Sequence, residues 1–320
     1  MSPLFFALAL FLVVLLVYMG RYSGRVRAEA TRFIAAPPDA VQARVADLSQ
    51  WQAWNPWLEH AREAVATVDG ATLAWDVPHV GRARVTALGP LRQKLAFALP
   101  FKFQGRSDWR LAPAPGGTQV TWRFKGRVAF TLRAFAATVQ GATQLDLRFG
   151  LDRLAAALNA EADPCTLDYA GVHDQPARTL AQQPFRAGLD ALAAELPPRI
   201  AAVRAQLASA GVASDGTAVV LYLKTHLKLR TVEGQVGVML AGETTPPDGL
   251  ALRELPAHRA YVLRFEGPPE ALELAWYQAM QRLRVEQLRP HPQLPPHALY
   301  LGDAAPGQRA AVALHLPLLG

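Results

Sequence analysis

The chain has 320 residues, of which 51% are hydrophobic and 18% charged, and this composition excludes an intrinsically disordered chain. Its length predicts two domains, and its single cysteine, Cys165, excludes an intramolecular disulfide and a thiolate-rich metal site. The net charge of +7 comes from the first half, because residues 21–164 carry 19 Lys/Arg and 12 Asp/Glu, whereas residues 165–320 carry 14 of each.

The first twenty residues contain no charged side chain, and they are followed at once by Arg21, Arg25 and Arg27. As a helix they would span about 30 Å, the thickness of the hydrocarbon core of a bilayer. We therefore predict a transmembrane anchor with a basic flank in residues 1–26. The positive-inside rule then predicts a single-pass protein whose soluble domains are cytoplasmic. A cleaved signal peptide and a buried core helix are the alternatives.

A first soluble unit is predicted from residue 27 to residue 160. It begins with a strand over 27–34, and Pro38 or Asp39 opens a short helix. A run with three tryptophans in seven residues follows, Trp51 to Trp57, and it is closed by a proline turn. These elements lead into a segment with a different period.

Apolar and polar residues then alternate, which is typical of antiparallel strands with one apolar face. Such alternation runs over 73–77, over 95–103 and over 120–124. Gly116-Gly117 indicates a hairpin turn. A helix follows whose apolar residues lie on one face: Leu147, Leu151, Leu154 and Leu158.

This order of elements, with the run Asp47–Trp57 and the strand Thr118–Trp122, resembles the START-like polyketide-cyclase superfamily, also called SRPBCC. The resemblance covers most of residues 27–160 and implies a helix-grip fold with a pocket for an apolar or lipid-like ligand. The candidate residues of this cavity are aromatic: Trp54, Trp57, Trp75, Phe97, Trp109 and Trp122. Each is alternatively a core residue, since aromatic side chains bury large areas in any fold.

The second soluble unit is predicted over residues 165–320, after a short linker at 159–164. A strand over 166–173 precedes a helical stretch over 185–211, which Pro197-Pro198 should break or kink. The strands that follow are predicted at 218–223, 234–240, 258–266, 298–301 and 312–316, and a helix starting after Gly267-Pro268-Pro269 separates the last two from the others. The unit is therefore α+β with two similar halves.

The segments Phe265–Leu272 and Leu299–Asp303, with the helix through Trp276, resemble the gyrase-inhibitor-like family, the effector-binding domain of AraC-type regulators. The resemblance implies an aromatic groove for small, often cationic molecules. The family's usual glutamate two positions before its tyrosine is Ala298 here, which removes the counter-charge for a cation. The candidate residues of this groove are Tyr222, Tyr261, Glu266, Trp276 and Tyr300.

No catalytic constellation is identified; Asp76 and His79 are the nearest acid–base candidates. The eight histidines show no metal-ligand spacing, and no cofactor motif occurs, so no metal and no cofactor are expected. The arginines are scattered, which argues against nucleic acid. The predicted partners are the lipid bilayer and a small apolar or amphipathic ligand, with a protein partner as a further candidate.

The sequence as a whole predicts an α+β chain with an N-terminal transmembrane helix, a START-like helix-grip domain and an effector-binding domain. The function that follows is non-enzymatic: the protein holds an apolar or amphipathic small molecule, with a lipid-like ligand in the first cavity. The alternatives are an enzyme of cyclase or hydrolase type in one of the cavities, and a protein-interaction or inhibitor module.

Overall fold

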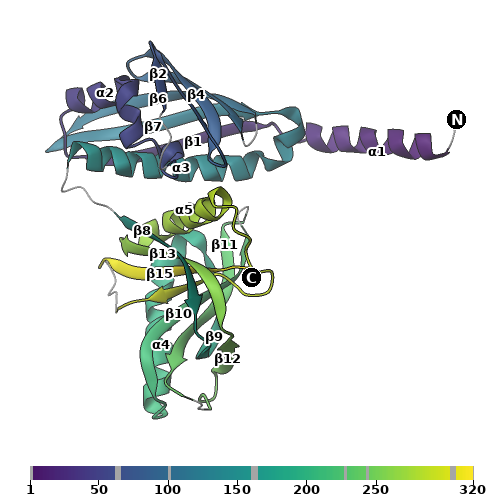
Figure 1. Cartoon of the computed structure of the whole chain (residues 1–320), viewed down its shortest axis with the longest axis vertical. Coiled ribbons are helices and arrows are strands. Elements are labelled where there is room, and N and C mark those ends of the chain that lie inside the picture. Colours follow the sequence, from purple (N-terminus) through teal and green to yellow (C-terminus); the bar gives the residue numbers. More distant parts are fainter. Residues whose placement is uncertain are drawn as a thin grey trace. The chain divides into compact units, whose positions relative to one another are not determined.

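The computed structural model describes residues 3–61, 66–99, 102–159, 165–226, 229–242, 245–302 and 308–319. The chain divides into two compact units, residues 1–163 and 164–320, each with its own sheet (Figure 1). Residues 160–164 of the predicted linker lie outside the described residues, as does Asp303 of the second family motif.

The first unit is built on a seven-stranded antiparallel sheet in the order β1-β7-β6-β5-β4-β3-β2. A long helix, α3, runs along this sheet (Figure 1). The strands are β1 (Arg25–Ile34), β2 (Thr67–Asp69), β3 (Thr72–Val77), β4 (Gly81–Gly89), β5 (Arg92–Leu99), β6 (Phe103–Ala114) and β7 (Gly117–Val128). The helical elements are α1 (Pro3–Gly20), α2 (Pro38–Ala46), η1 (Leu48–Ala53), η2 (Pro56–Leu58), η3 (Phe130–Phe135) and α3 (Ala136–Leu158).

The helix α3 also covers the open edge of the sheet at β1. The Gln140 side chain accepts a hydrogen bond from the Arg27 backbone N–H at 3.3 Å, and Gln144 accepts one from the Glu29 N–H at 3.0 Å. Gln144 also donates to the Glu29 carbonyl. These bonds satisfy main-chain groups of the edge strand that would otherwise be free to pair with a strand of another chain.

The predicted alternation over 95–103 is not one strand. β5 ends at Leu99 and β6 begins at Phe103, and the two strands pair antiparallel with Phe97 opposite Phe103. The two rings stack across the hairpin with centroids 5.8 Å apart. The alternation continued through the turn because both strands present their aromatic side chains to the same interior.

The second unit contains an eight-stranded antiparallel sheet in the order β12-β9-β11-β10-β14-β15-β13-β8. Its strands are β8 (Thr166–Gln175), β9 (Arg178–Gly188), β10 (Ser214–His226), β11 (Thr231–Leu240), β12 (Ala251–Leu255), β13 (His258–Gly267), β14 (His297–Tyr300) and β15 (Ala310–Pro317). Its helical elements are η4 (Leu189–Ala191), α4 (Leu192–Ser209), η5 (Pro269–Ala271) and α5 (Leu272–Val285).

Of the predicted break or kink at Pro197-Pro198, the break is wrong, since α4 continues through both prolines. The two residues cannot donate backbone hydrogen bonds. The helix nevertheless buries Leu196, Ile200 and Val203 on one side, and this apolar contact holds it in place. The start of the predicted helical stretch, residues 185–188, belongs instead to strand β9.

The predicted fold class needs correction. The structure consists mostly of two large antiparallel sheets with few helices, and an α+β chain led by a transmembrane helix does not describe it. Within the part of the chain that the structure describes, no helix combines the length and the apolar character needed to cross a membrane. The predicted anchor and single-pass localisation are therefore contradicted.

Candidate functional site

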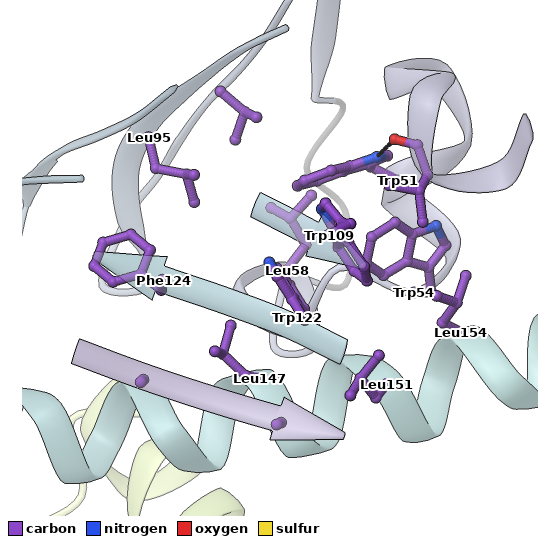
Figure 2. Packing of buried hydrophobic residues seen from close by; sticks show 14 of the residues in the cluster. Trp51, Trp54, Leu58, Leu95, Trp109, Trp122, Phe124, Leu147, Leu151 and Leu154 are labelled. Atoms are coloured by element: carbon purple, nitrogen blue, oxygen red, sulfur yellow. Dashed lines mark hydrogen bonds between the residues drawn. The ribbon is translucent and has the colours of Figure 1, made fainter. Parts of the chain in front are cut away.

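The tryptophans of the first unit form one cluster in its interior (Figure 2). The turns η1 and η2 bring Trp51, Trp54 and Trp57 against Trp122 on β7, with ring centroids 5.8–6.3 Å from that of Trp122. Trp109 on β6 stacks on Trp122 at 4.4 Å. The turns form here because Asp47 and Asn55, the residues before η1 and η2, accept hydrogen bonds from backbone N–H groups two residues further on.

Most of these indole N–H groups are bonded within the protein. Trp51 donates to the Val45 carbonyl at 2.9 Å, Trp109 to Gln93 at 2.9 Å, and Trp122 to Ser107. Trp54 differs from these three, because its buried Nε1 has no hydrogen-bond partner in the described part of the chain. A ring that is buried on both faces and bonded at its polar atom acts as core, which is the alternative weighed for these residues.

The six candidate residues of the first cavity therefore fall into two groups. Trp54, Trp75, Trp109 and Trp122 are at most 6% exposed and lie in the core cluster. Trp57 and Phe97 are partly exposed, contact each other at 5.2 Å and border this core. Trp57 also donates to the Asp146 carboxylate on α3 at 3.0 Å.

The acid–base candidates of the first unit do not face this interior. Asp76 is exposed and forms an ion pair with Arg82 at 2.5 Å across β3 and β4. His79 lies in the turn between these strands with a φ of 62°. Asp76 therefore lies in β3 and His79 in the adjoining turn, and both are exposed.

In the second unit three of the five candidates come together. Tyr222 on β10 contacts Trp276 on α5 with ring centroids 4.9 Å apart, and Tyr300 on β14 reaches the Tyr222 hydroxyl. Each of the three residues is partly exposed. We call Tyr222, Trp276 and Tyr300 the aromatic site.

The polar atoms of the aromatic site are withdrawn from water. The Tyr222 hydroxyl and Trp276 Nε1 are buried, and neither makes a hydrogen bond of normal geometry in the described part of the chain. Burial raises the pKa of Tyr222 to about 12, although its Trp276 and Tyr300 neighbours offset part of the effect. Burial also raises the pKa of Tyr300 well above its usual value. The site therefore offers uncharged donors at neutral pH.

The other two candidates of this groove do not join the site. Glu266 is exposed at the end of β13, 3.6 Å from Arg309. Tyr261 is fully buried within the same strand. Ala298, which stands in the place of the family's usual glutamate, is fully buried on β14. Among these residues no carboxylate faces the aromatic rings.

Sequence reasoning missed a cluster of histidines on the opposite face of this sheet. His297 on β14 lies directly opposite His315 on β15, and their rings stack at 5.1 Å. His258 contacts His297 at 5.7 Å. Burial lowers the pKa of His297 to about 4 and that of His315 to about 3. No spacing in the sequence indicates this cluster, because strand pairing creates it.

The histidine cluster is separate from the aromatic site. His297 pairs with Leu221 and with His315, and His315 pairs with Val262. Tyr300 lies three residues after His297 on the same strand, so its side chain points to the other face of the sheet. No group of three or more His, Cys, Asp or Glu suited to a metal ion is found among the residues that the structure describes.

The comparisons with known proteins support the prediction for the first unit. Residues 25–159 match the model of the family described as "Polyketide cyclase / dehydrase and lipid transport". This match supports the predicted resemblance of the first unit to START-like proteins, and the matched segment spans less than half of the chain. No curated protein matches the sequence.

Several solved structures match part of this chain at low identity. The C-terminal domain of EcmrR has 14% identity and a TM-score of 0.39, covering 48% of this chain and 98% of that one. TTHA0849 from Thermus thermophilus has 19% identity and a TM-score of 0.32, covering 42% and 98%. A START superfamily protein from Mycobacterium smegmatis has 17% identity and a TM-score of 0.33, covering 42% and 98%.

Proposed function

We propose that this protein binds an uncharged apolar or amphipathic small molecule, and that the aromatic site of the second unit contacts it. The observation that carries the proposal is the convergence of Tyr222, Trp276 and Tyr300 from three separate elements. Their ring faces supply apolar contact area, and burial of ligand carbon contributes about 25 cal/mol per Å².

The unsatisfied donors define the ligand more narrowly. A buried N–H or O–H without an acceptor is costly, and a ligand acceptor removes that cost. The Tyr222 hydroxyl and Trp276 Nε1 are buried, so a ligand meets them only when these side chains move, and a carbonyl or ether oxygen of the ligand then supplies their acceptor. The absence of a carboxylate at Ala298 favours an uncharged ligand over a cationic one.

The first unit supports the same class of ligand. The family that its sequence matches includes lipid transport in its description, and Trp57 with Phe97 forms the partly exposed border of its aromatic interior. We propose this border as a second contact point for an apolar ligand. The resemblance of the second unit to effector-binding domains belongs to the same proposal.

The test is a titration of the full chain with Nile red, an uncharged apolar dye with one carbonyl oxygen. Trp276→Leu removes an aromatic wall and should weaken binding about tenfold. Tyr222→Phe keeps the ring and removes a donor, so it should weaken binding less. Trp57→Leu is the matched change in the first unit.

The results separate the two units. Weaker binding in Trp276→Leu and Tyr222→Phe with unchanged binding in Trp57→Leu supports the aromatic site and rejects the second contact point in the first unit. Loss only in Trp57→Leu would move the site to the first unit and overturn the assignment. The proposal itself would be overturned if the full chain showed no saturable binding of Nile red. It would also be overturned if all three folded variants bound the dye as the native chain does.

A further inference from the structure

The outer face of the first sheet carries cations in register across four neighbouring strands. Arg27 on β1 lies opposite Lys125 on β7, Lys125 lies opposite Arg106 on β6, and Arg106 lies opposite Lys94 on β5. Since neighbouring strands are about 4.8 Å apart, this row spans about 14 Å. Four positive side chains thus stand side by side on one surface.

A second row lies two residues further along each strand. Arg25 on β1 is opposite Arg127 on β7, and the row continues through Gln104 and Ala96 to Arg84 on β4. We call the cations of both rows the basic face: Arg25, Arg27, Arg84, Lys94, Arg106, Lys125 and Arg127.

The seven side chains of the basic face are exposed, and none forms an ion pair with the residues that the structure describes. The next row on the other side is different. There Glu29, Arg123, Asp108 and Arg92 alternate in sign, and Arg123 binds Glu29 at 2.7 Å while Arg92 lies 3.6 Å from Asp108. The same surface therefore places an electrically balanced row beside two rows that carry only positive charge.

Opposite charges stabilise cross-strand pairs, whereas like charges directly opposite each other destabilise them. The basic face contains four such like-charge pairs: Arg27–Lys125, Lys125–Arg106, Arg106–Lys94 and Arg25–Arg127. Folding alone does not favour this arrangement. An anionic partner would turn the repulsion into attraction, and the charge excess of the first half of the chain lies on this unit.

Two observations favour a lipid surface over nucleic acid as this partner. The two rows contain no aromatic side chain on which a base would stack. The helix α1, which ends five residues before Arg25, exposes apolar side chains such as Phe11 (62%) and Leu16 (56%). A phosphodiester backbone offers nothing to such side chains, whereas a lipid surface offers apolar chains beneath its charged headgroups.

We propose that the basic face binds the anionic headgroups of a lipid surface peripherally, with no segment crossing the bilayer. The site consists of the seven cations, and its ligand class is an array of lipid phosphates and carboxylates. Each cation near such a surface contributes about 1 kcal/mol, or about fivefold in partitioning. Binding is therefore strongly dependent on salt.

The test measures sedimentation of the full chain with vesicles of phosphatidylcholine containing 0 to about 30% phosphatidylserine. The variant Lys94→Gln/Arg106→Gln/Lys125→Gln neutralises the middle of the basic face. It should lower the phosphatidylserine-dependent partitioning roughly a hundredfold and leave binding to pure phosphatidylcholine unchanged. The matched control, Arg186→Gln/Arg259→Gln/Arg289→Gln, removes the same charge from exposed positions of the second unit.

The control should keep near-native partitioning. Equal losses in both triple variants would mean that only net charge matters and would overturn the proposal. Tighter binding of duplex DNA than of the vesicles at equal salt, lost in the first variant alone, would assign the face to nucleic acid instead. Thermal unfolding at low salt is an independent readout, because relief of like-charge repulsion should leave the first variant at least as stable as the native chain.

Discussion

Acid should destabilise the second unit through its buried histidine cluster. Burial, together with the charges of Arg178 and of His258 and His173, disfavours protonation of His297 and His315 in the folded state. Their pKa values fall from 6.5 to about 4 and about 3. In the unfolded chain both rings take up protons below pH 6.5, so the unfolded state binds more protons than the folded one.

The sign and the size follow from this difference. The stabilising contribution is complete above pH 6.5 and is lost as the pH falls toward 4. Each histidine contributes a slope of about 1.4 kcal/mol per pH unit, so the two together lower the free energy of unfolding by about 3 kcal/mol for each unit between pH 5.5 and 4.5. A domain stable by 5–15 kcal/mol loses a large fraction of its stability over this range.

The assay has to report the second unit alone. The protein is equilibrated in urea at each pH and then labelled by a short pulse of hydrogen exchange under one fixed condition. Peptides from β14 and β15 then give the unfolding curve of the second unit. His315→Gln should reduce the pH slope to about half, whereas His226→Gln, which lies outside the cluster, should leave it unchanged.

A flat free energy of unfolding between pH 6 and pH 4.5 would refute this reasoning. The reasoning would also be refuted if His315→Gln kept the native pH slope, because this substitution removes the protonation difference of that ring. The absolute stability of His315→Gln at pH 7 does not enter the comparison, since only the slope reports the titration.

Three further substitutions probe the first unit, whose unfolding in urea can be followed by fluorescence because it contains six of the seven tryptophans. Gly150→Ala should destabilise it by about 1–3 kcal/mol, since the added Cβ would lie 2.6 Å from the Trp122 ring. Gly141→Ala, on the same helix α3 with nothing within 4 Å, should stabilise it by about 0.5–1 kcal/mol; the same sign for both would contradict the packing argument. Ser107→Ala leaves the buried Trp122 N–H without its acceptor and should cost about 1–3 kcal/mol, and an unchanged unfolding midpoint would show that this hydrogen bond contributes nothing.

Local patterns in the sequence were sufficient for most elements of the fold. Alternation over 120–124 and the glycine pair at 116–117 predicted β7 and its hairpin, and apolar spacing predicted the closing helix α3. These features depend on residues close together in the chain. Prediction from such local patterns fails where the alternation continues through a turn, as between β5 and β6. It also fails where tertiary contacts keep a helix intact, as at Pro197.

Only the tertiary structure decided which side chains meet. Composition and motifs gave an aromatic-rich first unit with the START-like pattern, but strand pairing decided that Trp122 stacks on Trp109 while Trp57 stays at the border. Strand order likewise brings Arg27 and Lys94 into one row, though 66 other residues separate them in the chain. The physical reason is that a sheet's register sets the opposing residues, and no local propensity encodes the register between distant strands.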